Sequence, residues 1–293
     1  MRVLLLGPNG QLGTDITRAH DEAGARFELV PVGRSVLDVG KPGEVDRVLG
    51  GIDFEALVNC TSYHKTDEVE DNASQAFAVN SHAVQALAKL CAAKKARFFH
   101  VSTDYVFGGD TARAEPLTEN DATAPVNVYG ASKAMGETLA RLACEDTVIL
   151  RVASLFGVAG ASGKGGNFVE TMIRFGREKG ALRVVSDQVM SPTSTADIAG
   201  AVLRMLEGRC EPGIWHVVNN GSASWFEFAC EISRRAGIDA EMTPCASADY
   251  PTRAMRPRYN ALDNAKLTSA VGPMPAWQDA LDRYLRAKGH RTA

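Results

Sequence analysis

Short apolar runs separated by longer stretches with helical spacing fill the first half of the chain. The runs at residues 2–6, 27–32, 55–59, 96–102 and 147–152 are almost continuously apolar, as strands covered on both faces must be. Apolar positions recur at helical spacing in residues 12–24, 72–95 and 128–143, with Asn72 as an N-cap of the second helix. This alternation predicts an α/β fold with a doubly wound parallel sheet over residues 1–155.

The pattern changes beyond residue 155. A glycine-rich stretch precedes helices expected at 169–180, 195–208 and 276–288, with short strands at 182–186 and 213–219. No linker, low-complexity tract or internal repeat separates the two halves. We therefore expect residues 156–293 to form mainly a smaller C-terminal α/β lobe, with some segments returning to the first domain.

Composition and charge exclude several classes of protein. The 293 residues are 45% apolar and 23% charged, with a net charge of −3, which argues against a nucleic-acid partner or a polybasic membrane anchor. No apolar run reaches the roughly 18 residues of a membrane span. The first ten residues are too short and too glycine-bounded for a signal peptide. The six scattered cysteines fit free thiols in a reducing cytoplasm better than disulfides or a metal site, so we expect a cytoplasmic location.

Residues 7–13, GPNGQLG, stand where the first strand should end and the first helix begin. Gly7, Gly10 and Gly13 permit a tight turn, a close approach of backbone to phosphate and close helix–strand packing. The N–H groups of the helix N-terminus suit a pyrophosphate. The spacing is GxxGxxG rather than the dehydrogenase GxGxxG. The context nevertheless predicts a dinucleotide site in a Rossmann-type fold.

The end of the second strand should carry the group that reads the adenosine ribose. An acid there favours NAD, whereas an arginine accommodates the 2′-phosphate of NADP. Arg34 stands at this place and Asp38 follows. We therefore expect NADPH as the cofactor, with NADH as an alternative; a lone surface arginine is the simpler interpretation.

Tyr129 and Lys133 lie four residues apart in a predicted helix, so both would face the same side. Ser102 and Thr103 follow the fourth strand, at the edge where open α/β sheets bind ligands. By itself the Tyr–Lys pair could be a tyrosine over a lysine on a solvated surface. Together with the glycine loop, the pattern resembles the extended short-chain dehydrogenase/reductase superfamily.

The expected chemistry is the reduction of a carbonyl group, with Thr103, Tyr129 and Lys133 as catalytic residues. A free tyrosine has a pKa near 10, too high for efficient proton exchange at neutral pH. We expect Lys133 and the oxidised nicotinamide to lower the pKa of Tyr129. Thr103 would bond the substrate oxygen, and Lys133 would also bond the nicotinamide ribose.

Seven further stretches, from residue 3 to about 285, resemble one family in this superfamily, the dTDP-4-dehydrorhamnose reductases. They are GPNGQLG, VNCTSYHKTDEVE, STDYVFGG, DATAPVNVYGASKAMGE, GKGGNF, DQVMSPTSTADIA and YPTRAMRPRYNALD. The resemblance implies NADPH-dependent reduction of a nucleotide-linked 4-keto-6-deoxysugar, with the C-terminal lobe binding the substrate. It implies cofactor contacts from Gln11, Leu12, Thr61, Ser62, Tyr63, Ser102, Tyr129 and Lys133. It implies substrate contacts from Thr103 and Asp104, and Ser154 and Asn167 are further substrate candidates; Arg256 is a candidate for the substrate's phosphates, with plain surface charge as the alternative. Asp104 as a turn cap is the structural alternative.

The chain departs from that family at several positions. Ser154 replaces a tryptophan that usually lies against the substrate, which removes an apolar platform. His64 and Lys65 occupy places where small or apolar residues are usual, either as polar loop residues or as parts of a reshaped pocket. Lys164 and Arg258 are further candidates for the substrate's phosphates, with plain surface charge as the alternative.

Magnesium is not expected, because only one acid remains where some relatives bind it at an interface. The three positions are Asp15, Ala196 and Gln278. A homodimer is one option for the assembly of this chain.

Two other functions remain open. A nucleotide-sugar dehydratase typically has an acid after the strand-end Thr-Asp, and Tyr105 in that place argues against dehydration. An epimerase is less easily excluded. A non-catalytic subunit resembling the regulatory subunit of methionine adenosyltransferase is the alternative from another class. Co-purification with a synthetase and no turnover would favour that alternative.

Overall fold

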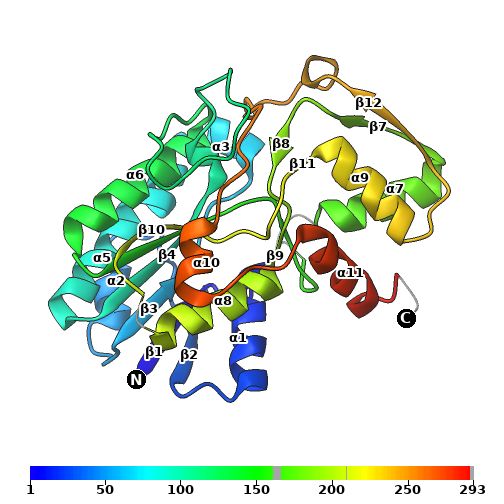
Figure 1. The fold of residues 1–293 in the computed structure, drawn as a ribbon. Coiled ribbons are helices and arrows are strands. Elements are labelled where there is room, and N and C mark those ends of the chain that lie inside the picture. The colour runs from blue at the N-terminus through cyan, green and yellow to red at the C-terminus, as the bar shows by residue number, and fades with distance from the viewer. Residues whose placement is uncertain (161–165, 209, 291–293) are drawn as a thin grey trace.

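A six-stranded parallel sheet forms the centre of the molecule (Figure 1). The computed structural model describes residues 1–160, 166–208 and 210–290. The strand order is β10-β5-β4-β3-β1-β2, so the chain reverses its winding direction beside β1. The strands are β1 (Arg2–Leu6), β2 (Glu28–Val32), β3 (Ala56–Asn59), β4 (Arg97–Thr103), β5 (Thr147–Val152) and β10 (Gly213–His216). The predicted Rossmann-type fold class is confirmed.

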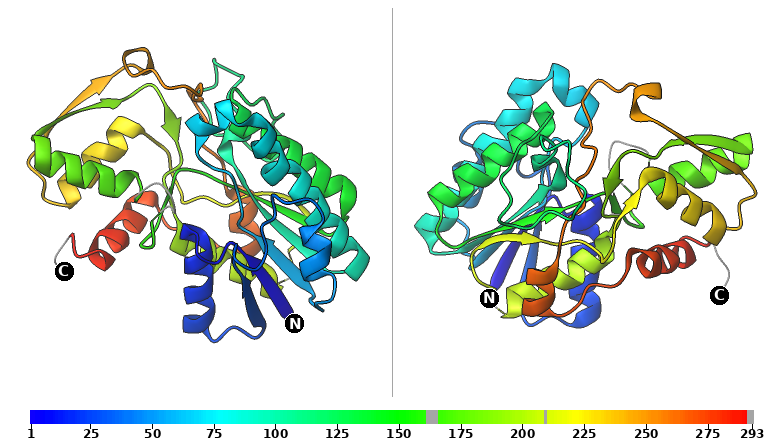
Figure 2. Two further views of the ribbon diagram at one scale, coloured as in Figure 1. Left: turned by 180° about the vertical axis from the view of Figure 1, so that it is seen from behind. Right: turned by 45° about the horizontal axis from the view of Figure 1, so that its top comes forward.

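Helices cover both faces of this sheet (Figure 2). One face packs against α1 (Gln11–Ala23), α8 (Thr195–Gly208) and α10 (Ala265–Val271). The other packs against α2 (Glu44–Leu49), α5 (Ala83–Lys94) and α6 (Val128–Ala143). Strand β10 and helices α8 and α10 come from beyond residue 155, so part of the second half of the chain completes the central sheet and its cover.

The remaining C-terminal segments form a smaller lobe beside the sheet, on the right in Figure 1. Its helices α7 (Phe168–Lys179), α9 (Trp225–Arg235) and α11 (Trp277–Ala287) enclose a core that includes Phe156, Phe228, Trp277 and Tyr284. Strand β7 (Ala181–Val185) pairs with β12 (Glu241–Cys245) at its rim. Two short pairs, β6 (Leu155–Phe156) with β9 (Thr193–Ser194) and β8 (Val189–Met190) with β11 (Ala223–Ser224), complete it.

The helix expected over residues 72–95 is divided. It consists of α4 (Ala73–Phe77), a π-helical turn η1 (Ala78–His82) and α5, and α3 (Thr66–Asp71) precedes it. Asn72 does not cap α4; its amide donates to the carbonyl of Glu68 at 2.8 Å. The π turn carries Asn80, a fully buried side chain that bonds residues before α3 and on α6. Such turns frequently accompany functional sites.

A buried ion pair joins α6 to the sheet. Nη2 of Arg151, on β5, donates to Oε2 of Glu137 at 2.7 Å, and both side chains are almost fully buried. The hydroxyl of Ser102, on β4, donates to the other Glu137 oxygen at 2.5 Å.

Within the described residues, no helix has the length and apolar character needed to cross a membrane.

We expect Arg151→Met to lower the free energy of unfolding by about 3–5 kcal/mol, because Glu137 would remain as an unpaired buried carboxylate. Urea unfolding of the two proteins measures this loss. Arg183→Met is the control, since the pair of Arg183 with Asp249 is exposed and should contribute little. Equal losses in both variants would contradict this role of the buried pair.

Candidate active site

A cleft of about 830 Å³ opens at the carboxyl ends of the sheet strands. Helix α9 of the smaller lobe contributes Trp225 to its wall, and α6 contributes Tyr129 and Lys133. The predicted site residues that line it are Gly7, Gly10, Gln11, Leu12, Gly13, Arg34, Asp38, Thr61, Ser62, Tyr63, Ser102, Thr103, Asp104, Tyr129, Lys133 and Ser154. Residues spread over most of the described chain therefore meet in one place.

The glycine loop forms a backbone cradle at one end of the cleft. Gly7 has a φ of 76°, which favours glycine. A Cβ atom on Gly13 would lie only 2.2 Å from the carbonyl oxygen of Gly7, so the start of α1 packs directly on the turn. No side chain caps α1 at Gly10. The first N–H groups of α1 are thus oriented as a pyrophosphate would require.

Arg34 follows β2 at the rim of the cleft. Its guanidinium lies 3.4 Å from the carboxylate of Asp38, and 83% of the Arg34 side chain is exposed. A contact this long and this exposed holds the arginine only weakly. The side chain is therefore accessible to an anionic group in the cleft.

The small residues around Tyr129 and Lys133 are explained by close packing of α6. A Cβ atom on Gly130 would lie 2.0 Å from the carbonyl oxygen of Tyr105, and one on Gly136 would lie 2.1 Å from that of Asn80. Neither backbone contact would tolerate a larger residue. Helix α6 is consequently held at a fixed depth against its neighbours.

Tyr129 lies among other hydroxyl groups. It is hydrogen-bonded with Thr103 and with Ser62, and its ring meets that of Tyr105 edge-on at 5.8 Å between centroids. Burial raises the pKa of Tyr129 to about 12, and the hydrogen bond with Thr103 opposes this effect. The protein alone therefore does not give the lowered pKa expected from the sequence.

The position of Lys133 explains this difference. Its Nζ donates to the carbonyl of Val101 at 2.7 Å and lies 3.1 Å from Nε2 of His100, both on β4. Burial lowers the pKa of Lys133 to about 8. The amine is thus bonded to the strand, and it is not among the groups that shift the pKa of Tyr129.

Asp104 begins a short 3-10 turn, η2 (Asp104–Val106), directly after β4. One carboxylate oxygen accepts a hydrogen bond from the Thr103 hydroxyl at 3.0 Å, and the other accepts one from the amide of Asn260. Burial raises the pKa of Asp104 to about 7, although these bonds favour the charged form. Asp104 therefore fixes Thr103 beside Tyr129 and titrates near neutral pH.

Two predicted substrate residues do not line the cleft. The amide of Asn167 caps α7 and donates to Gly157, to the Tyr284 hydroxyl and to Gln11. Arg256 donates to the carboxylate of Asp67 at 2.7 Å. Their polar groups are engaged by protein partners, and their contact with a substrate stays a prediction. Arg258 is exposed outside the cleft, and Lys164 lies outside the described residues.

Other residues of the site were missed from the sequence. Trp225 is half-buried, packs on Phe168 with ring centroids 4.6 Å apart and borders the same cleft as Ser154. Asn59 and His100 are fully buried beneath the cleft. Asn59 and His100 could have been found from the sequence, because each is a polar residue in an apolar strand and buried polar groups need partners.

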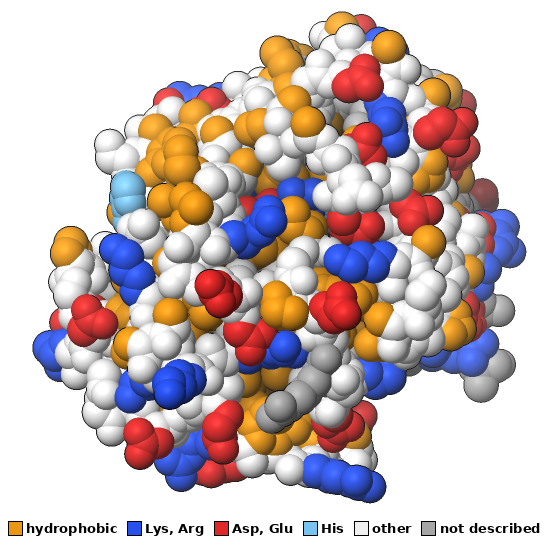
Figure 3. Space-filling view, turned by 60° about the vertical axis from the view of Figure 1, so that its left-hand side comes forward, with side chains coloured by type: hydrophobic (Ala, Val, Ile, Leu, Met, Phe, Trp, Pro, Cys, Tyr) orange, Lys and Arg blue, Asp and Glu red, His pale blue; other side chains and the backbone are white. Residues whose placement is uncertain are grey.

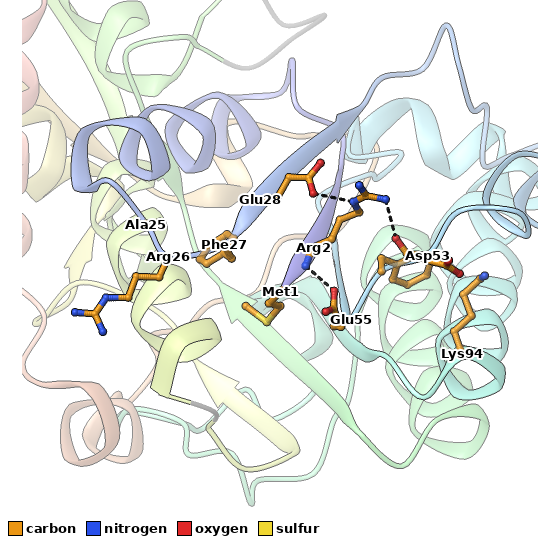
Figure 4. Close-up of a pocket in the computed structure, with 10 residues that line it drawn as sticks. Met1, Arg2, Ala25, Arg26, Phe27, Glu28, Asp53, Glu55 and Lys94 are labelled. Atoms are coloured by element: carbon orange, nitrogen blue, oxygen red, sulfur yellow. Dashed lines mark hydrogen bonds and ion pairs between the residues drawn. The ribbon is translucent and has the colours of Figure 1, made fainter.

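The opposite edge of the sheet holds a second hollow, near the start of the chain (Figure 4). Its charged groups pair with one another: Arg2 donates to Glu28 at 2.9 Å, and the backbone N–H of Arg2 donates to Glu55. On the face drawn in Figure 3, acidic and basic side chains are interspersed. Among the described residues, no group of three or more His, Cys, Asp or Glu side chains could hold a metal ion.

A Rossmann-type sheet with a glycine cradle, a strand-end hydroxyl and a Tyr-x-x-x-Lys pair defines an NAD(P)-dependent oxidoreductase of the extended short-chain dehydrogenase/reductase class. Residues 1–289 match the family model described as the RmlD substrate binding domain. The chain belongs to the dTDP-4-dehydrorhamnose reductase family.

Relatives resemble the chain over nearly its whole length. The dTDP-4-dehydrorhamnose reductase of Mycolicibacterium smegmatis is 37% identical over 289 residues, which cover 98% of this chain and 85% of that protein. The crystal structure of a dTDP-4-dehydrorhamnose reductase from Clostridium acetobutylicum has a TM-score of 0.92 and 33% identity, and covers 99% of this chain and 100% of that one. The reductase of Bacillus anthracis in complex with NADP has a TM-score of 0.89 and 32% identity, and covers 98% and 99%.

We expect Asp104→Asn to remove one component of the pH dependence of stability. The pKa of this carboxyl is raised from 3.8 to about 7 on folding, so its contribution is complete below about pH 4 and is lost as the pH rises to about 7. The wild type should therefore lose up to about 1.4 kcal/mol per pH unit relative to the variant in this window. Urea unfolding across the window measures the difference, and Asp239→Asn, an exposed carboxylate, is the control. Parallel pH profiles for wild type and Asp104→Asn would refute the raised pKa.

Proposed function

We propose that the protein is an NADPH-dependent reductase of a nucleotide-linked 4-keto-6-deoxysugar, similar to dTDP-4-dehydrorhamnose reductase. The observation that carries this proposal is the meeting of Thr103 and Tyr129 hydroxyls beside the glycine cradle in one cleft. On this proposal residues 1–155 hold the cofactor, and residues 156–293 mainly supply the substrate side.

The residues present fit a dinucleotide. The uncapped start of α1 and the cradle at Gly7 would hold the pyrophosphate, and Arg34 would reach the adenosine 2′-phosphate. Thr61 and Ser62, which follow β3, line the same cleft as the glycine cradle and Arg34 and would also contact the dinucleotide. The relative from Bacillus anthracis was crystallised with NADP, which supports the same choice of cofactor here.

The reaction follows from the placement of the hydroxyl groups. When bound, the reduced nicotinamide supplies a hydride to the carbonyl carbon of the sugar. Tyr129 donates its phenolic proton to the carbonyl oxygen, so that the C=O group becomes CH–OH. Thr103 orients the carbonyl by donating its hydroxyl proton to the same oxygen, for which it exchanges its hydrogen bond to Asp104. The phenolate that remains on Tyr129 is then reprotonated from solvent.

The sugar-facing wall differs from the family pattern at Ser154. Ser154 lines the cleft with a φ of 41°, and Trp225 of α9 borders the same cleft. An aromatic face is a suitable surface for an apolar sugar face. The proposal therefore assigns the apolar contact to Trp225, which lets a 6-deoxysugar bind without a tryptophan at position 154.

We expect Tyr129→Phe to lower kcat by about 10²–10⁴-fold, because the variant lacks the proton donor while its ring still fills the same volume. The loss of NADPH absorbance with dTDP-4-dehydrorhamnose and other nucleotide 4-keto sugars measures turnover. NADPH affinity should change little. Near-normal activity of this variant would remove Tyr129 from its role, and tight NADPH binding without turnover of any sugar would favour a regulatory subunit.

We expect Arg34→Ala to weaken NADPH binding by about 10–100-fold, because a charge-assisted hydrogen bond to phosphate contributes about 1.5–3 kcal/mol. NADH binding should change much less. Arg26→Ala, at the opposite edge of the sheet in Figure 4, is the control that removes one arginine far from the cleft. Equal losses for both cofactors in Arg34→Ala would contradict recognition of the 2′-phosphate.

A further inference from the structure

A chain of buried polar groups runs from the end of β3 to Lys133. Asn59 and His100 are fully buried and lie opposite each other in the register of β3 and β4. The backbone N–H of Thr61 donates to Oδ1 of Asn59 at 3.0 Å, and the Thr61 hydroxyl donates to the same oxygen at 2.6 Å. Because a backbone N–H can only donate, this contact fixes which amide atom of Asn59 is the oxygen.

The orientation of Asn59 determines the tautomer of His100. Nδ2 of Asn59 lies 3.1 Å from Nδ1 of His100, and an amide nitrogen can only donate, so Nδ1 carries no proton. Burial holds the pKa of His100 well below its usual value, and the neutral ring keeps its single proton on Nε2. Nε2 lies 3.1 Å from Nζ of Lys133, so the N–H of His100 points at that nitrogen.

The charges around Lys133 lead to the same conclusion. An ammonium group has no lone pair to accept a hydrogen bond, whereas an uncharged amine has one. Glu137, on the same helix as Lys133, is paired with Arg151 of β5 at 2.7 Å, so the charge of its carboxylate is already balanced by the guanidinium. Burial raises the pKa of Cys60 and of Tyr129 to about 12 each, so neither supplies a negative charge at neutral pH. A charged Lys133 would lack an anionic partner of its own.

We propose that His100 is a positioning residue that, oriented by Asn59, donates its Nε2 proton to the Lys133 amine and so stabilises the uncharged form of Lys133 against β4. The ammonium form of Lys133 has no lone pair, so protonation of the amine requires that this hydrogen bond be given up. Burial lowers the pKa of Lys133 to about 8, so the uncharged amine prevails above about pH 8.

The catalytic consequence rests on the proposed function. As long as Lys133 is bonded to His100, it contributes no charge that would favour the phenolate of Tyr129. The activation of Tyr129 therefore depends on a displacement of Lys133 away from β4 that also brings a proton to its amine. His100 acts through Lys133 and does not itself line the cleft.

Nitrogen NMR of histidine-labelled, cofactor-free protein tests the tautomer directly at about pH 9.5, above the pKa of Lys133. We expect His100, assigned by its absence from His100→Gln, to carry its proton on Nε2. His216 is an internal reference, because its Nδ1 contacts the carbonyl of Asp263 at 3.1 Å and must carry the proton there. A proton on Nδ1 of His100 would overturn the proposal.

Asn59→Asp replaces the side-chain nitrogen with an oxygen and should reverse the donor–acceptor direction of the hydrogen bonds from residue 59 through His100 to Lys133. The new oxygen must accept, so the His100 proton should move to Nδ1, and bare Nε2 should accept from a Lys133 ammonium group. We expect the pKa of Lys133, followed by the Cε signal of lysine-labelled protein, to rise by at least one unit, a tenfold gain in proton affinity. Thr61→Val is the matched control, since its backbone N–H still fixes Asn59 and the tautomer should not change.

A reversed tautomer with an unchanged pKa of Lys133 would overturn the influence of His100 on Lys133. If Asn59→Asp does not fold, the tautomer of the wild type decides alone. The pH profile of kcat/KM then tests whether these hydrogen bonds affect catalysis. The apparent pKa assigned to Lys133 in that profile should be higher in Asn59→Asp than in the wild type. Absence of turnover with every nucleotide sugar would refute the proposed function, whereas the spectra of the cofactor-free protein would still decide the inference.

Discussion

The close, polar contact between α6 and the sheet is the constraint on which the site depends. Gly130 and Gly136 bring the helix against the carbonyl groups of Tyr105 and Asn80, and the Glu137–Arg151 pair anchors it to β5. A helix held at this depth turns Tyr129 toward the cleft and Lys133 toward β4. Because buried polar groups need partners, Tyr129 and Lys133 are held together with the groups that support them.

The sequence predicted most of the framework because its signals are local. Apolar strands, the glycine loop and the Tyr-x-x-x-Lys spacing each lie within a few residues, and sixteen predicted residues meet in the cleft. The protein partners of Asn167 and Arg256 could not be foreseen, because Tyr284 and Asp67 are 117 and 189 residues away. The placement of Lys133 against β4 was not foreseen for the same reason, since its partners His100 and Val101 lie on another element.

The smaller lobe is connected to the glycine-loop end of the cleft as well as to the wall that contains Trp225. Asn167 donates to Gln11 in the glycine loop and to the hydroxyl of Tyr284 on α11, and that hydroxyl donates to Glu170 on α7. Helices α7 and α11 therefore support the loop that opens α1, although neither helix lines the cleft. Asn167 thus joins the two parts of the molecule.

The depth of α6 also limits how such a protein can diversify during evolution. Positions 130 and 136 admit no side chain beyond hydrogen, and the neighbouring Ser132 is bonded by Asn80 and Ser81. Larger residues at positions 130 and 136 would therefore displace α6, and new substrate preferences should arise elsewhere. Ser154 and Trp225 line the cleft from other elements than α6, so inherited change in specificity should accumulate there while Tyr129 and Lys133 stay in place.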